Sequence, residues 1–171
     1  MTERVDPPQT GSEAVQIFAF LDYQRATLLK KTAGLDAEAL NRTLPPSTMT
    51  LGGMLKHLAL VEDYWFSYIF AGNDAARIFA DVDWDADPDW EWHSAAQDRP
   101  QVLRSLLAEI VEHCRHVVEG ESLDALSVRP NRRTGDRFTL RWVVLHMIEE
   151  YARHNGHADL VRESIDGQTG E

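Results

Sequence analysis

The sequence predicts an all-α protein, a four-helix bundle with long connections after its second and third helices. Four stretches, each of roughly 20 residues, place apolar side chains at helical spacing. We find no stretch with the apolar–polar alternation that is typical of a strand. A chain of 171 residues is long enough for one buried core, and long amphipathic helices bury their apolar stripes most simply against one another.

The first helix is expected to begin after Ser12, a residue type that caps helices, and to continue to Lys31. Residues 1–11 contain paired prolines and a glycine, so we expect a flexible lead-in there. Gly34 ends the helix, and Asp36 caps a short turn that follows. Two consecutive prolines then predict a loop, because neither fits inside a helix.

A second helix is predicted from Thr50 to Phe70, and Gly72 closes it. Gly52 and Gly53 lie in its first turn, where glycine is unfavourable, which suggests that a neighbour or a ligand approaches the backbone closely. The apolar stripe of this helix comprises Leu51, Met54, Leu55, Leu58, Val61, Trp65 and Ile69.

Residues 80–93 are expected to form a long loop with neither helix nor strand. Three tryptophans and six acidic residues are interspersed in this segment. A loop of this length inside a compact domain is usually functional or disordered. The tryptophans favour order, because exposed indole rings are uncommon outside contacts.

A third helix is predicted from Pro100, which suits the first turn of a helix, to Glu119 before Gly120. A second long connection follows over residues 121–138 and contains four arginines. We expect these arginines to be solvated, although an anionic substrate is an alternative partner.

The fourth helix is predicted to begin after Thr139 and to continue to about Ile165. Residues 167–171 form a polar tail, so the expected bundle covers residues 12–166. No internal repeat marks a second domain, and the chain length agrees with a single one.

Composition excludes several classes of function. The formal net charge of −11 argues against binding to nucleic acid or to an anionic membrane surface, both of which need a basic protein. No apolar run is long enough to cross a membrane, and the first residues lack the pattern of a signal peptide. The single cysteine excludes an intrachain disulfide, so we expect a cytoplasmic protein.

The predicted fourth helix carries a carboxylate and an imidazole on the face that should be buried. Glu150 and His154 lie on a helical wheel about 20° to either side of Val143, inside the apolar stripe. A metal ion would use both groups as ligands and so remove the cost of burying the carboxylate. His57, at the edge of the second helix's stripe, is the candidate third ligand. An internal Glu150–His154 pair without metal stays open as the alternative.

Two nitrogens and one oxygen suit zinc, with nickel or iron as alternatives, and three protein ligands leave one position open, as in catalytic sites. His146 and His157 lie about one turn before and after the pair, where we expect them to line the cavity or to orient a ligand, although either one is an alternative ligand. His113 and His116 point away from the third helix's apolar stripe, which predicts a solvated face. Cys114 lies in that stripe as a small apolar residue.

Two segments together carry a family resemblance. The first is Gly53-Met-Leu-Lys-His57-Leu-Ala-Leu-Val-Glu-Asp-Tyr-Trp65, and the second extends from Leu140 through Glu150 and His154 to Glu163. They resemble the DinB-like superfamily, in the branch near the mycothiol-dependent maleylpyruvate isomerases. The resemblance extends over about residues 13–167.

The resemblance implies a four-helix bundle with a divalent metal on His57, Glu150 and His154. Many relatives carry histidine at the position of Glu150, whereas the isomerase branch is similar to this chain in carrying glutamate. Relatives often carry glutamine at the position of His157, so this chain departs from the pattern there.

The resemblance also implies transfer of a low-molecular-weight thiol such as mycothiol to a small-molecule electrophile, in a protein that often forms homodimers. The carboxylates of the cofactor or substrate have Arg25, Arg153 and the arginines of residues 129–137 as candidate partners. A metal-dependent hydrolase and a non-catalytic, stress-related metal-binding protein stay open as alternatives.

Overall fold

A computed structural model describes residues 4–170 and confirms the all-α class. Within this range the only β-type pairing is an isolated bridge between Leu126 and Thr139. Residues 1–3 of the expected lead-in and residue 171 of the expected tail lie outside the described part, and the lead-in, bundle and tail boundaries stay predictions. The elements are α1 (Glu13–Thr32), α2 (Ala37–Leu40), α3 (Leu51–Glu62), η1 (Asp63–Phe70), α4 (Arg77–Ala80), α5 (Trp90–Ser94), η2 (Ala95–Gln97), α6 (Pro100–Val118) and α7 (Leu140–Asp166).

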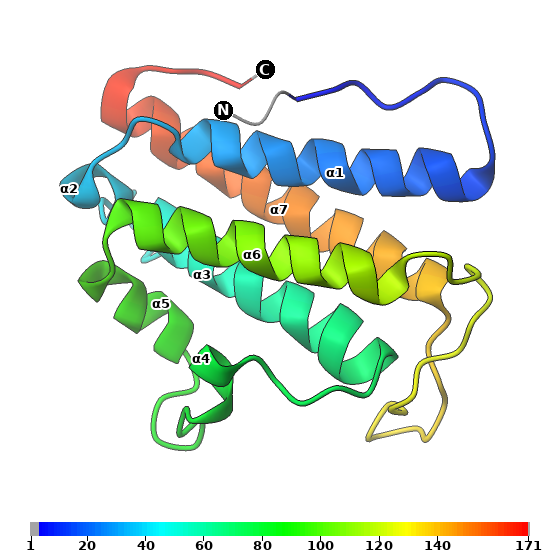
Figure 1. The fold of residues 1–171 in the computed structure, drawn as a ribbon. Helices are drawn as coiled ribbons and strands as arrows, with labels where there is room; N and C mark the ends of the chain where they lie inside the picture. The colour runs from blue at the N-terminus through cyan, green and yellow to red at the C-terminus, as the bar shows by residue number, and fades with distance from the viewer. Residues whose placement is uncertain (1–3, 171) are drawn as a thin grey trace.

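The four long helical segments pack around one core (Figure 1). α1 packs against α7, α7 against α3, and α3 against α6. η1 continues directly from α3 and contacts both α6 and α7. α5 packs beside α3 on the side of the bundle where α4 also lies. The long connections follow the second and third long segments, as the sequence predicts.

Local chemistry explains where the helices begin. The hydroxyls of Ser12, Thr50 and Thr139 each accept a hydrogen bond from a backbone N–H in the first turn of α1, α3 and α7. The carboxylate of Asp36 does the same for α2. These acceptors satisfy donors that have no partner inside the helix. The predicted starts of α1, α3 and α7 are therefore confirmed, and α6 begins at the predicted Pro100 without a side-chain cap.

The second predicted helix changes type halfway, which the sequence does not foresee. After Glu62 the chain continues as the π-helical segment η1, whose wider turn rotates the buried face. Trp65 of η1, expected in the stripe, is only partly buried, and so is Val61, which lies before η1 in the last turn of α3. Phe66 and Phe70 are buried in their place. The expectation of one continuous α-helix stripe to Phe70 is wrong for this reason.

The prediction of a loop without helix over residues 80–93 is also wrong in part. Trp90 opens the short helix α5, and Ala80 is the last residue of α4. All three tryptophans of the segment pack against the core, with Trp84 and Trp90 in an edge-to-face contact. The expectation of order from the tryptophans is confirmed, because the indole rings bury apolar surface that would otherwise face water.

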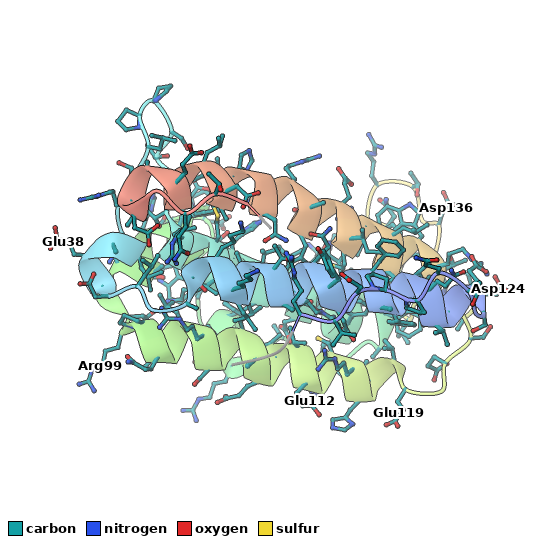
Figure 2. All side chains as sticks on the ribbon, turned by 90° about the horizontal axis from the view of Figure 1, so that it is seen from above. Glu38, Arg99, Glu112, Glu119, Asp124 and Asp136 are labelled. Atoms are coloured by element: carbon teal, nitrogen blue, oxygen red, sulfur yellow. The ribbon has the colours of Figure 1, made fainter. Side chains whose placement is uncertain are left out.

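The outside of the bundle is strongly charged (Figure 2). The charged residues labelled there are all exposed and point away from the helices: Glu38, Arg99, Glu112, Glu119, Asp124 and Asp136. Among the described helices, none combines the length and the apolar character that a membrane crossing requires.

Candidate metal centre

The three residues proposed as ligands from the sequence lie together. His57 on α3 and Glu150 and His154 on α7 each offer one ligand atom, and these atoms all lie within 4.8 Å of one another. The rings of His57 and His154 meet edge to face, with 4.9 Å between their centroids. Helix packing between α3 and α7 thus brings together side chains that are about 90 positions apart in the sequence.

α7 positions its two residues by ordinary helical geometry. Residues four apart lie on the same face, so Glu150 and His154 stand one above the other, with Glu150 Oε2 3.7 Å from His154 Nε2. His154 is 8% exposed, and Glu150 is partly buried at the edge of the core. Burial lowers the pKa of His154 to about 4, with the neighbouring His57, His157 and Arg153 acting in the same direction. His154 is therefore neutral at pH 7, the form in which imidazole binds a metal.

His57 is held from behind by a carboxylate. Its Nδ1 lies 2.9 Å from Oε1 of Glu91, a residue of α5 that is 5% exposed. A carboxylate at this position favours the tautomer with the proton on Nδ1, which leaves the lone pair on Nε2 for a ligand contact. The same carboxylate–histidine pairing is typical of histidines that bind metals.

Trp92, also on α5, covers the other side of His57. The two rings stack with 4.9 Å between centroids and 28° between planes. The indole comes this close because Gly53 faces it from α3: a Cβ at position 53 would lie 2.4 Å from Cε3 of Trp92. Gly53 precedes His57 by four residues and so shares its helix face. The close backbone approach expected at this glycine is confirmed.

His146 and His157 both lie next to the cluster, each against a different member of it. His146 Nε2 is 3.7 Å from Oε1 of Glu150, and its ring stacks on Trp142. The ring of His157 contacts that of His154 edge to face at 5.7 Å. Glu150 therefore has an imidazole on each side, and the roles expected for His146 and His157 stay predictions.

The donor set fits a divalent metal. Ligand atoms in tetrahedral zinc sites lie roughly 3.4 Å apart, so small side-chain rotations would close these three atoms on an ion. Within residues 4–170, Nδ1 of His154 is buried without a hydrogen-bond partner. The two oxygens of the Glu150 carboxylate lie 3.7 Å from His146 Nε2 and His154 Nε2. Glu150 Oε2 and His154 Nε2 make no direct hydrogen bond at 3.7 Å, and the alternative of an internal pair without metal stays open.

The structure separates several other candidates from this cluster. His113 and His116 are exposed on α6, as expected, and His113 contacts Ser67. Cys114 is buried, and burial holds the pKa of its thiol well above the usual range, so it is no nucleophile. Arg25 is not free to hold a carboxylate of a substrate, because its guanidinium is buried against Glu62 at 2.6 and 2.7 Å.

Sequence reasoning missed Glu91 and Trp92, the two residues that hold His57 in place. They lie in the segment expected to be a loop without helix, where alternating acids and tryptophans gave no periodicity to follow. One signal was present: Gly53 and His57 share a helix face, so a bulky group from elsewhere had to pack beside the histidine.

Comparison with known proteins supports the family resemblance. The model of the mycothiol-S-transferase family matches residues 16–167, nearly the whole chain. None of the curated proteins searched matches the chain. With its helical bundle and its His–Glu–His cluster, the chain belongs to the mycothiol-S-transferase family, within the DinB-like superfamily.

Proposed function

We propose that the protein is a metal-dependent thiol S-transferase that uses mycothiol, with its metal on His57, Glu150 and His154. The observation that carries the proposal is the convergence of two imidazoles and one carboxylate within 4.8 Å in a member of this family. Zinc is the first candidate, with nickel or iron as alternatives, because two nitrogens and one oxygen suit all three.

Three protein ligands leave a coordination position for a small molecule. A divalent metal held by His57, Glu150 and His154 would supply Lewis acidity that lowers the pKa of a thiol. The remaining chemistry belongs to the side chains of this chain and to the electrophile.

The side chains around the cluster have separate tasks. His146 is the proposed acceptor of the thiol proton, because its Nε2 lies 3.7 Å from Glu150 Oε1, it is not one of the proposed metal ligands, and it is partly exposed to solvent. Glu91 keeps His57 in one tautomer, and Trp92 shields that imidazole from water. In the transfer, the sulfur forms a bond to the electrophilic carbon. The bond between this carbon and its leaving group breaks, and the electron pair of that bond departs with the leaving group.

Two measurements test the proposal. Protein purified without chelator should carry about one metal ion per chain by elemental analysis, as expected for a single three-ligand site. Incubation with mycothiol and 1-chloro-2,4-dinitrobenzene should give the thioether adduct and chloride, with glutathione as the comparison thiol. His154→Ala should lose metal and adduct, whereas His116→Ala, an exposed histidine on α6, should keep both.

Other outcomes are equally informative. Metal well below one ion per chain contradicts the proposed centre. Bound metal with ester hydrolysis and no thioether favours a hydrolase, in which the nucleophile is water. Bound metal with neither reaction favours a non-catalytic metal-binding protein.

A further inference from the structure

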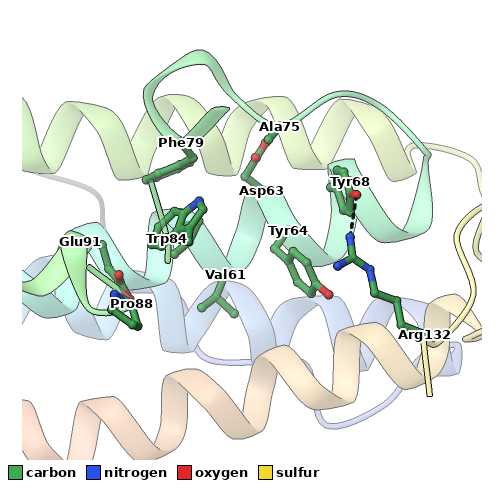
Figure 3. A pocket seen from close by; sticks show the side chains of 11 residues that line it. Val61, Asp63, Tyr64, Tyr68, Ala75, Phe79, Trp84, Pro88, Glu91 and Arg132 are labelled. Carbon is green, nitrogen blue, oxygen red and sulfur yellow. Dashed lines mark hydrogen bonds between the residues drawn. The ribbon is translucent and has the colours of Figure 1, made fainter. Parts of the chain in front are cut away.

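A cavity of about 510 Å³ lies beside the candidate metal centre, between the α3–η1 segment and residues 75–91 (Figure 3). This volume is in the range of small-molecule sites. The three proposed metal ligands do not line it, but Glu91 does, and Glu91 also contacts His57. Its walls are mainly apolar and aromatic, formed by Leu60, Val61, Tyr64, Tyr68, Phe79 and Trp84.

One end of the cavity presents a positive charge. Arg132 Nη2 donates to the hydroxyl of Tyr68 at 3.3 Å, and no carboxylate within residues 4–170 forms an ion pair with its guanidinium. The neighbouring Arg129 does not line the cavity: its Nη1 donates to the carbonyls of Tyr68 and Asn73, and its guanidinium covers the Tyr68 ring at 3.8 Å. Arg132 is therefore the cation that lines the cavity, and it has donors left for an anionic group.

The other end presents an acceptor that lacks a donor. Glu91 is 5% exposed, and while its Oε1 contacts His57, its Oε2 is buried with no hydrogen-bond partner in the described chain. Leaving a buried carboxylate oxygen unpaired is unfavourable, so a donor on a ligand would satisfy it. Asp63, the other acid that lines the cavity, already accepts from the backbone N–H of Ala76 at 2.9 Å.

We propose that this cavity binds the electrophilic substrate of the transfer reaction, a flat, largely apolar acid. Its anionic group would meet Arg132, its ring would lie against Tyr64 and Trp84, and an O–H or N–H at its far end would donate to Glu91. The identification of the ligand as electrophile rests on the proposed transferase function. The binding preference does not, because it follows from the lining of the cavity.

Binding without turnover tests the preference. The metal-loaded protein, with no thiol present, is titrated by calorimetry with three probes of one shape: 6-hydroxy-2-naphthoate, 2-naphthoate and 6-hydroxy-2-naphthamide. The first should bind most tightly. 6-Hydroxy-2-naphthamide, which lacks the charge, should bind about tenfold more weakly or worse, because it loses the ion pair with Arg132. 2-Naphthoate, which lacks the hydroxyl, should bind about fivefold more weakly, because it loses one hydrogen bond to Glu91.

Three variants locate the site. Arg132→Gln should weaken binding of 6-hydroxy-2-naphthoate about tenfold. Arg133→Gln is the matched control, because Arg133 is an exposed arginine of the same loop that does not line the cavity, and it should have no effect. Ala75→Phe puts a ring into the cavity and should abolish binding. Thermal melts establish that each variant is folded.

Several results would overturn the proposal. One is that no probe binds, or that all three bind equally. Another is that the Arg132→Gln and Arg133→Gln variants behave alike, which would point to carboxylate coordination at the metal or to surface charge. Unchanged binding in Ala75→Phe also rejects the cavity. If the thioether forms but 6-hydroxy-2-naphthoate does not bind most tightly, the cavity proposal is rejected and the transferase function stays. If 6-hydroxy-2-naphthoate binds most tightly but no thioether forms, only the transferase function is rejected.

Discussion

His57 illustrates how much of the candidate centre depends on single contacts. Its imidazole is held by the carboxylate of Glu91 on one nitrogen and by the stacked ring of Trp92 on one face. Neither residue is close to His57 in the sequence, and both come from α5, which has five residues. The orientation of this proposed ligand is therefore set by residues that need not touch the metal.

Removing the carboxylate behind His57 should weaken metal binding. Glu91→Ala frees the imidazole to rotate and to change tautomer, and we expect the zinc dissociation constant to rise about 10- to 100-fold. Chelator competition measures this constant. Asp85→Ala, which removes an exposed acid of the same segment, is the control and should bind zinc like the unchanged protein. Equal losses in the two variants would mean that Glu91 acts only through overall charge.

At the scale of elements, Gly53 in the first turn of α3 and Gly156 in the interior of α7 have opposite surroundings. Gly53 of α3 faces the ring of Trp92, with 2.4 Å between an added Cβ and Cε3. Gly156 of α7 is exposed and has nothing within 4 Å of an added Cβ. The first glycine makes room for a helix–helix contact, and the second only weakens the helix.

Alanine substitutions should separate these two cases. Gly156→Ala should raise the free energy of unfolding by about 0.5–1 kcal/mol, because alanine loses less backbone entropy in a helix. Gly53→Ala should lower it by about 1–3 kcal/mol, because the indole must move out of a packed position. Urea unfolding measures both. A stabilised Gly53→Ala variant would show that Trp92 moves away freely, and that α5 does not hold His57.

At the scale of the whole molecule, a buried charge network joins three of the four long helices. Arg25 of α1 forms a bidentate pair with Glu62 of α3, and the hydroxyl of Tyr151 of α7 donates to the same carboxylate at 3.0 Å. Glu62 and Tyr151 are fully buried. Each partner satisfies groups that would be costly to bury alone, so the network favours one arrangement of the bundle.

Removing one partner of the Arg25–Glu62 ion pair should lower the free energy of unfolding far more than removing both partners. Arg25→Met leaves the carboxylate of Glu62 buried without its cation, and we expect the free energy of unfolding to fall by about 3–5 kcal/mol. In the double variant Arg25→Met/Glu62→Met, most of that loss should be recovered, because no uncompensated charge remains. Chemical denaturation measures both variants. If the double variant is no more stable than the single one, packing rather than charge explains the loss.

Features that depend on contacts between residues close in the sequence were predicted correctly, whereas several features that depend on contacts between distant segments were not. Ser12, Thr50 and Thr139 cap their helices through bonds that span three residues, so sequence alone locates these starts. Glu150 and His154 share a face for the same local reason. The π-helical segment after Glu62 was not predictable, because no residue type in the segment marks it; η1 packs against α6 and α7.

The sequence by itself determined the all-α class, the four long helices and the pairing of Glu150 with His154 on one buried face, because helical periodicity and capping act within a few residues. Only the tertiary structure decided that His57 meets this pair, that Arg25 is engaged by Glu62, and that residues 90–94 form a helix beside His57. A five-residue helix is not stable alone in water, so the contacts of Glu91 and Trp92 with α3 stabilise α5. Contacts between distant segments therefore complete the candidate centre.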